Sequence, residues 1–160
     1  YHRALRSLGR RAFSSAELAA KLSEAGGTQA EVAAVVARLS ENGYLNDREY
    51  VENFIRSRRD QKMYGRSRIL KELSLQGIEE RFIREALEEF FPLDAEKRTI
   101  QQAINRKLRS LLGKNCSAEN ADMDAKKISK LYNYLARQGF HPESIREALE
   151  PLRHNSGEWE

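Results

Sequence analysis

The chain has little cysteine and histidine and no long hydrophobic run. Cys116 is the one cysteine in 160 residues, which excludes an internal disulfide and leaves no second thiol for a zinc site. No apolar stretch approaches the roughly 20 residues that span a bilayer, and no secretory signal pattern opens the chain. These absences predict a soluble, cytoplasmic protein without membrane contact.

The sequence also lacks a recognisable catalytic or metal-binding pattern. His2, His141 and His154 stand apart, without a carboxylate or thiol at the spacing of a triad or a metal site. No phosphate-binding loop and no dinucleotide-binding glycine fingerprint is present. Paired acids such as Glu79 and Glu80 stand among arginines on predicted helices, which indicates a solvated surface. We therefore expect no catalytic residue, no metal and no cofactor.

Charge is plentiful, and its distribution along the chain is uneven. Charged residues make up 32% of the sequence, and the formal net charge is +4. Residues 55–71 include seven basic residues and one acid, and residues 97–114 include six basic residues and no acid. Between them, residues 77–96 carry two arginines and seven acids. This segregation predicts an acidic partner, either a protein surface or a nucleic acid.

One pattern of apolar residues and glycine occurs three times, each time over 22 residues. Its members are Leu18, Leu22, Gly26, Val32, Val36 and Leu39, then Ile69, Leu73, Gly77, Ile83, Leu87 and Phe90, then Leu131, Leu135, Gly139, Ile145, Leu149 and Leu152. Each copy reads as a helix, a glycine stop and another helix, and a further helix precedes each pair. The sequence therefore predicts an internal repeat.

The predicted fold is all-α, with three tandem three-helix repeats in an elongated, curved array. No segment shows the alternation typical of strands. We place repeat 1 at 1–45, repeat 2 at 46–91 and repeat 3 at 92–153, followed by a flexible tail at 154–160. The extra length of repeat 3 is expected in a long helix over 93–112 and a loop over 113–120.

Local signals predict several helix limits. Ser14 with Glu17, and Asn46 with Glu49, have the spacing of N-terminal caps. Gly77 is expected at the left-handed position that ends a helix.

Basic residues on helix faces are the candidate binding site for an acidic protein or a nucleic acid. They are Arg56, Arg59, Lys62, Tyr64, Arg66, Arg68 and Lys71 in repeat 2, and Arg98, Arg106 and Arg109 in repeat 3. A charged helix face is often only solvated, but a row of cations along an elongated body suits a phosphate backbone or an acidic protein groove. Arg66, Arg68 and Lys71 are expected to face outward.

Two residues of repeat 2 have alternative interpretations. Tyr64 either stacks on a nucleic-acid base or closes the joint between two helices. Arg58 falls inside an apolar stripe, where either its aliphatic stem covers the edge of the core or its guanidinium forms a buried ion pair.

A set of short runs in and just before repeat 2 is distinctive. The runs are Gly43-Tyr44-Leu45-Asn46-Asp47-Arg48-Glu49-Tyr50-Val51, Phe54-Ile55-Arg56-Ser57-Arg58, Tyr64-Gly65, Arg68-Ile69, Glu72-Leu73 and Gly77-Ile78. In these runs the chain resembles the RecX family of bacterial recombinase regulators. Repeat 1 agrees at Ala4-Leu5, Leu8, Ser14, Glu17-Leu18 and Lys21-Leu22, and repeat 3 matches loosely. Family members usually carry a glycine where this chain has Met63 and a proline where it has Arg66.

The resemblance implies a cytoplasmic, non-enzymatic regulator of recombination and DNA repair. Such a protein binds the RecA recombinase, lies in the groove of the RecA filament on DNA, and mainly inhibits ATPase and strand-exchange activity. We expect a monomer whose partner is the RecA filament, with single- or double-stranded DNA as a second candidate partner. The alternative function is a helical-repeat protein that binds nucleic acid directly.

Overall fold

The computed structural model describes residues 1–112 and 123–154, and the regular structure in these ranges is entirely α-helical. The helices are α1 (His2–Leu8), α2 (Ser15–Glu24), α3 (Gln29–Glu41), α4 (Asp47–Lys62), α5 (Arg66–Leu75), α6 (Glu80–Phe90), α7 (Leu93–Leu112), α8 (Ala125–Gln138) and α9 (Pro142–His154). The predicted all-α class is confirmed. The loop predicted at 113–120, Cys116 and residues 155–160 of the tail lie outside the described residues.

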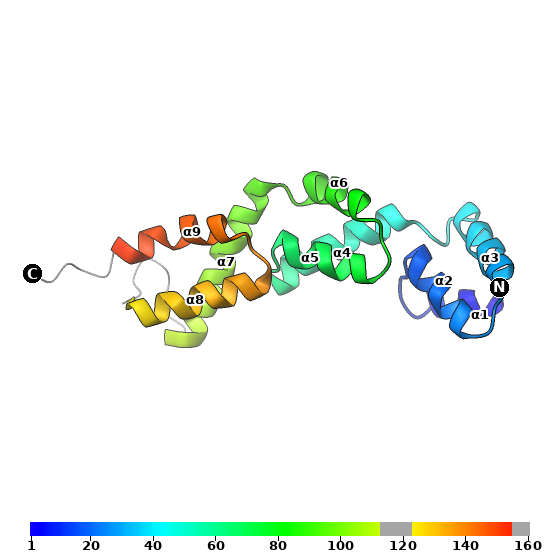
Figure 1. Ribbon diagram of the computed structural model, residues 1–160, viewed down its shortest axis with the longest axis horizontal. Coiled ribbons are helices and arrows are strands. Elements are labelled where there is room, and N and C mark those ends of the chain that lie inside the picture. The colour runs from blue at the N-terminus through cyan, green and yellow to red at the C-terminus, as the bar shows by residue number, and fades with distance from the viewer. Residues whose placement is uncertain (113–122, 155–160) are drawn as a thin grey trace, which may run out of the picture.

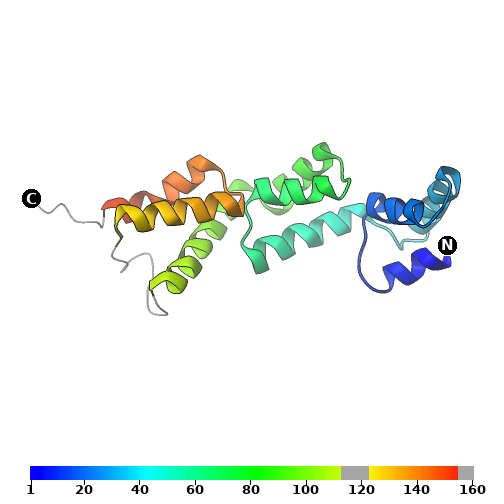
Figure 2. The ribbon, with the colours of Figure 1, turned by 60° about the horizontal axis from the view of Figure 1, so that its bottom comes forward.

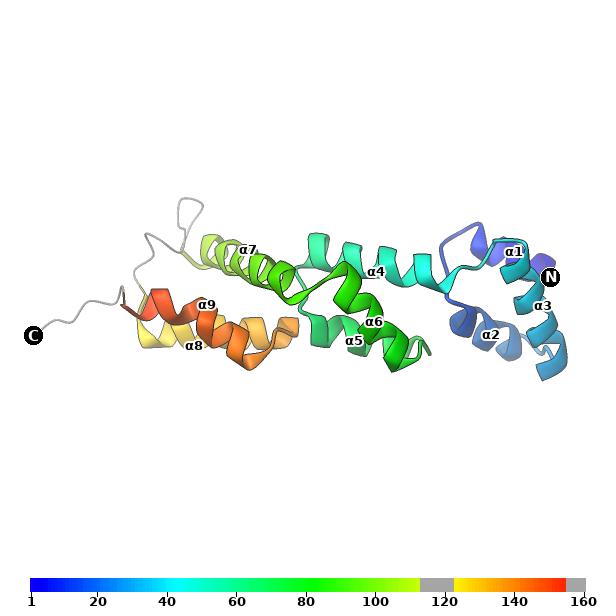
Figure 3. The same ribbon diagram turned by 90° about the horizontal axis from the view of Figure 1, so that it is seen from above.

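The helices follow one another in three groups along an elongated molecule (Figure 1). The group α1–α3 lies at one end, α4–α6 in the middle and α7–α9 at the other end (Figures 1 and 3). This arrangement confirms the predicted array of three-helix repeats.

Each group of helices buries its own hydrophobic cluster. Leu18 belongs to the first cluster, Ile69 to the second and Ile104 to the third, and all three are fully buried. Ala95 of α7 belongs to the second cluster, and Met63, after α4, packs against the third. Repeats 2 and 3 therefore each contribute a side chain to the packing of the other. The exact first and last residues of the repeats remain a prediction.

The recurring glycine follows the first helix of the pair in every copy. Gly26, Gly77 and Gly139 have φ angles of 93°, 79° and 87°. A residue with a Cβ is strained in this left-handed region, whereas glycine is not. The predicted positive φ of Gly77 is confirmed.

The predicted helix starts are also confirmed. Ser14 Oγ accepts the N–H of Glu17 at 3.0 Å, and Asn46 Oδ1 accepts the N–H of Glu49 at 3.2 Å. The long helix α7 covers the predicted range. The apolar spacing of Ile104, Leu108 and Leu111 predicts that Leu111 lies on the inner face of α7, but Leu111 is 39% exposed.

Candidate interaction surface

The turn between α4 and α5 carries several of the predicted binding residues. Met63 has a φ of 54° and is the one residue other than glycine with a positive φ in the described ranges. This conformation costs roughly 1–2 kcal/mol when a Cβ is present. The packing of the Met63 side chain against the third cluster offsets part of that cost. Met63 thus stands at a position where a glycine would be unstrained.

Repeat 3 satisfies the backbone at the start of α5. The first N–H groups of a helix have no partner within the helix. Here the N–H of Gly65 donates to the carbonyl of Gln138 at 2.8 Å, and the N–H of Ser67 donates to the carbonyl of Gly139 at 3.2 Å. A Cβ at Gly65 would lie 2.3 Å from that Gly139 oxygen. Gly65 is therefore required by this close approach, and the N-terminus of α5 is docked on the C-terminus of α8.

Glu96 caps the same helix from α7. Its Oε1 accepts the backbone N–H of Arg66 at 3.0 Å, and the residue is 3% exposed. Burial raises the pKa of the Glu96 carboxyl, while the hydrogen bond from Arg66 and the charges of Arg66 and His141 act in the opposite direction. A proline at position 66 would have no N–H to donate. Sequence reasoning missed Glu96, although its position four residues before Ile100, on the apolar face of α7, signals a buried acid.

Arg68 is held at the same joint. Its Nη1 donates to the carbonyl of Arg137 at 3.2 Å, its Nε donates to Glu72 at 3.3 Å, and its Nη2 donates to the Tyr64 hydroxyl at 2.9 Å. The guanidinium lies 3.7 Å from the centre of the Tyr64 ring. Arg68 therefore does not simply face outward as expected, because it fastens repeat 2 to repeat 3. The geometry of Tyr64 agrees with closure of a helix joint, and its contact with a base remains a prediction.

Arg59 and Arg66 also make internal contacts. Arg59 donates to the carbonyl of Phe90 at 2.9 Å and pairs with Asp60 at 2.6 Å. This pairing raises the pKa of Arg59 and lowers the pKa of Asp60. The Arg66 side chain is 16% exposed and forms an ion pair with Glu88. The expectation that Arg66 faces outward is wrong, because this ion pair holds it against α6.

Arg58 has features of both alternatives, coverage of the core edge and an ion pair. Its guanidinium lies 4.3 Å from the centre of the Phe54 ring, and its Nε pairs with Glu72 Oε2 at 2.8 Å. The side chain is 31% exposed. Arg58 therefore covers the edge of the core and forms a half-buried ion pair.

The remaining predicted cations lie on the surface. They are Arg56, Lys62, Lys71, Arg98, Arg106 and Arg109. Arg56 pairs with Glu52 at 2.6 Å, and Arg106 Nη1 donates to the carbonyl of Gln61 at 3.4 Å. The other four cations have no hydrogen bond or ion pair within the part of the chain that the structure describes. These four side chains are available to an external anion.

Three of these six cations line two hollows beside the joint of repeats 2 and 3. A hollow of about 390 Å³ is lined by Met63, Gln102, Asn105, Arg106 and Arg109 and has no acid in its lining. A second hollow, of about 430 Å³, includes Lys71 in its lining. Arg56, Lys62 and Arg98 line neither of these two hollows. The expected continuous track remains a prediction.

Sequence reasoning missed a further basic face on α8. Lys126, Lys130 and Arg137 are exposed, and their spacing places them along one side of the helix. Lys107 of α7 lies 5.1 Å from the centre of the Tyr134 ring on α8, so the two basic helices adjoin. The signal was available in the sequence, because residues 125–138 contain no Asp or Glu.

The described residues contain no group of three or more His, Cys, Asp or Glu that could hold a metal ion. Among the helices that the structure describes, none is long and apolar enough to cross a membrane.

Comparison with known proteins identifies relatives along most of the chain. Residues 1–39 match the first three-helix domain of RecX, and residues 46–87 match the second. Regulatory protein RecX from Chlorobium phaeobacteroides is 32% identical over 149 residues, which cover 93% of this chain and 90% of the relative. Regulatory protein RecX from Caldanaerobacter subterraneus is 32% identical over 146 residues, which cover 91% of this chain and 66% of the relative.

Solved structures show the same fold. The crystal structure of RecX from Lactobacillus salivarius matches with a TM-score of 0.77 at 20% identity, covering 96% of this chain and 94% of that one. A second crystal structure, of a regulatory protein RecX, matches with a TM-score of 0.73 at 21% identity, covering 94% of this chain and 70% of that one.

Proposed function

Because the chain belongs to the RecX family of regulatory proteins, we propose that it binds the RecA filament on DNA and restrains the ATPase and strand-exchange activities of RecA. The observation that carries this proposal is the set of exposed cations without internal partners near the joint of repeats 2 and 3. An acidic protein groove would supply the anions that these side chains lack. The protein acts as a cytoplasmic, non-catalytic regulator.

The shape of the molecule supports the proposed binding mode. An elongated array of helical repeats presents an extended surface that can follow a helical groove (Figure 1). Lys62 ends α4, Lys71 lies on α5, and Arg98 and Arg109 lie on α7, so the contacts are spread over three helices. Binding then depends on many moderate contacts, and electrostatic attraction affects mainly the association rate.

Direct binding to nucleic acid is the second candidate function. It is favoured by α8, where Lys126, Lys130 and Arg137 lie along one side of a helix without acids. A row of cations of this kind suits a phosphate backbone.

A pair of titrations separates the two functions. The protein is titrated onto bare single-stranded DNA and onto a preformed RecA filament on the same DNA at one salt concentration, and RecA ATPase is recorded in parallel. The proposal expects tight binding to the filament, weak binding to bare DNA and a reduced ATPase rate. Equal affinity for both, with an unchanged ATPase rate, would contradict the proposal and support direct DNA binding.

The unpaired cations are tested by charge reversal. We expect the double variant Arg98→Glu and Arg109→Glu to weaken filament binding at least about tenfold, because each substitution removes an attraction and adds a repulsion. Both residues are exposed, so each substitution should change the free energy of unfolding by about 0.5 kcal/mol or less. The matched control is Arg81→Glu with Arg84→Glu on α6, which makes the same change of charge on exposed arginines.

The comparison between these variants decides the role of the cations. One outcome is that the Arg98→Glu and Arg109→Glu variant folds and restrains RecA to the same extent as the α6 control. That result would show that these two arginines are only solvated surface residues. If DNA phosphates are the partner instead, each lost contact should reduce the slope of the logarithm of the binding constant against the logarithm of the salt concentration by roughly 0.7 to 0.9.

A further inference from the structure

A groove of about 650 Å³ runs along α4 between repeats 1 and 2. One wall is a face of α4 that includes Asn53, Ser57 and Arg58, and the other is formed by the links before α2 and before α4. From Asn46 to Arg58, α4 rises by about 18 Å. This length matches about five residues of extended chain. Figure 2 shows the start of α4 beside α2, where the two repeats meet.

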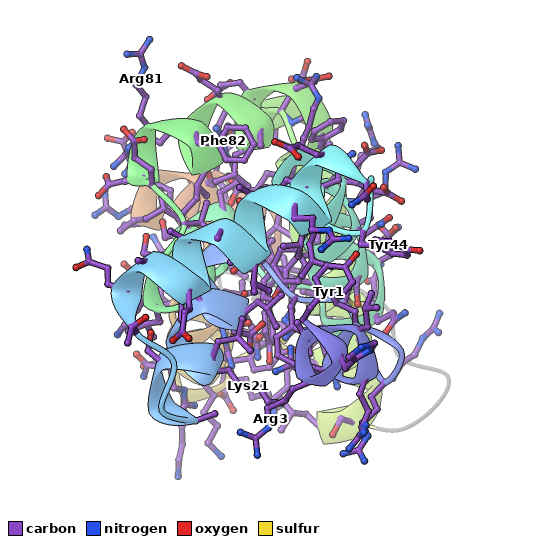
Figure 4. The ribbon with its side chains drawn as sticks, turned by 90° about the vertical axis from the view of Figure 1, so that its right-hand side faces the viewer. Tyr1, Arg3, Lys21, Tyr44, Arg81 and Phe82 are labelled. Atoms are coloured by element: carbon purple, nitrogen blue, oxygen red, sulfur yellow. The ribbon has the colours of Figure 1, made fainter. Side chains whose placement is uncertain are left out.

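Several aromatic side chains line the groove. Phe13, Tyr44, Tyr50 and Phe54 all line it. Tyr44 is 57% exposed, and the end-on view places it at the outer edge of the molecule (Figure 4). Large amphipathic side chains of this kind commonly anchor protein interfaces. Phe13 is buried, and Tyr50 and Phe54 pack against the second cluster, so Tyr44 is the aromatic side chain that the groove exposes most.

Polar groups in the groove are also available. Asn53 and Ser57 lie one helical turn apart, and neither has a hydrogen-bond partner among the described residues. An asparagine amide can donate to a carbonyl and accept from an N–H, which matches the backbone of an extended peptide. The hydroxyl of Tyr50, in contrast, is already bonded to Gln76 Oε1 at 2.7 Å.

The charges of the groove favour a peptide over a phosphate backbone. Arg11 donates two bonds to Glu17, at 2.9 and 2.6 Å, and Glu49 adds an acid to the lining. Arg58 pairs through Nε with Glu72, and its two terminal nitrogens make no hydrogen bond within the described residues. Because Glu72 also pairs with Arg68, the two arginines keep one net positive charge. One net positive charge is enough for one carboxylate, whereas a phosphate backbone needs a row of cations.

The geometry points to this groove as a docking site for an extended, apolar peptide segment that carries one carboxylate toward Arg58. The inference rests on the proposed function, since the segment is placed on the RecA filament. The segment's apolar side chains lie against Tyr44 and Phe54, and its backbone bonds to Asn53. Because the groove walls belong to two repeats, an occupied groove also fixes the orientation of repeat 1 relative to repeat 2.

The test uses two groove variants and a fluorescent reporter. Tyr44→Ala removes the exposed anchor and is expected to weaken binding to the preformed RecA filament about tenfold. Ser57→Trp fills the groove and should weaken binding by a similar factor. The matched control is Leu93→Ala, because Leu93 is 59% exposed, close to the exposure of Tyr44, and lies outside the groove. Tyr44→Trp, in a Trp159→Phe background, should shift its emission to the blue when the filament is added.

The outcomes separate this inference from the proposed function. Wild-type protein that does not bind the filament contradicts the proposed function itself. Wild-type binding that is lost on reversal of Arg98 and Arg109, but is unchanged in Tyr44→Ala and Ser57→Trp, overturns the groove alone. An emission shift with bare single-stranded DNA also overturns it, because the groove would then hold bases. Loss of filament binding in both groove variants, with the control unchanged, supports a peptide site.

Discussion

Gly77 and Gly26 share one conformation but differ in their surroundings. Their φ angles are 79° and 93°. A Cβ at Gly77 would lie 2.9 Å from the Ala16 Cβ, across the joint between repeats 1 and 2, whereas a Cβ at Gly26 would meet nothing within 4 Å. The same repeated position is therefore sterically crowded in repeat 2 and open in repeat 1.

We expect Gly77→Ala to destabilise the protein more than Gly26→Ala does. The positive φ alone costs about 1 kcal/mol in each variant. The contact with Ala16 in repeat 1 should add about 1 kcal/mol in Gly77→Ala, since the alanine methyl cannot rotate away. Chemical denaturation of the two variants measures the difference. Equal losses would show that the joint moves apart at no cost.

The reason for a glycine at position 65 could not be predicted from the sequence. The sequence predicts that Gly65 interrupts a helix, and it does stand between α4 and α5. Its φ of −78° is open to any residue, and the left-handed residue of this turn is Met63. The glycine is needed because Gly139, far away in sequence, approaches its backbone. Local patterns cannot predict such a contact.

At the scale of the helix, the periodicity of apolar residues predicts most of the fold. The range of α7, the start of α9 at Pro142 and the repeated glycine stops all follow from local spacing. The candidate site was less predictable, because Arg59, Arg66 and Arg68 look like surface cations in sequence. Each of them also has a partner on another helix, and Arg68 reaches into repeat 3.

The start of α5 yields a pH-dependent prediction through Glu96. Burial raises the pKa of this carboxyl above its ordinary value of 4.5, against the opposing effects of Arg66 and His141. A raised pKa in the folded state favours folding at low pH, and this contribution is lost as the pH rises through the folded pKa. Glu96→Gln keeps an acceptor for the Arg66 N–H and removes the titration. We therefore expect the stability of Glu96→Gln relative to wild type to increase as the pH rises from about 4 to neutrality.

Denaturation midpoints at several pH values provide the measurement. Glu96→Ala is the matched control, because it also removes the charge but leaves the N–H of Arg66 without its acceptor. It should cost about 1–3 kcal/mol relative to Glu96→Gln at every pH. A stability difference between wild type and Glu96→Gln that stays constant with pH would contradict the raised pKa.

At the scale of the molecule, the two joints are built differently. Between repeats 1 and 2, the N–H of Ser15 donates to Asp47 Oδ1 at 2.7 Å, and Ser14 Oγ donates to the carbonyl of Gln76 at 3.4 Å. Between repeats 2 and 3, the backbone of α5 itself is completed by α7 and α8. Sequence reasoning predicts separable repeats joined flexibly, but the hydrogen bonds indicate that repeats 2 and 3 depend on each other.

We expect fragments to show this asymmetry. A fragment over 46–154 keeps every backbone bond at the start of α5 and should unfold in one cooperative transition. A fragment over 1–98 keeps Glu96 but loses the carbonyls of Gln138 and Gly139, so its second repeat should be destabilised by about 2 kcal/mol or more. Hydrogen exchange at the amides of α5 measures the effect in both fragments. Equal protection of α5 in the two fragments would show that repeat 2 is independent.

The docking of α8 on α5 also has an electrostatic consequence. A helix carries about half a positive charge at its N-terminus and about half a negative charge at its C-terminus. Here the negative end of α8 meets the positive end of α5, so the two partial charges largely cancel. In sequence, a glycine followed by Arg66 and Arg68 at a helix start looks suited to phosphate. In the folded chain that end is already neutralised, so the start of α5 offers little attraction to an anion.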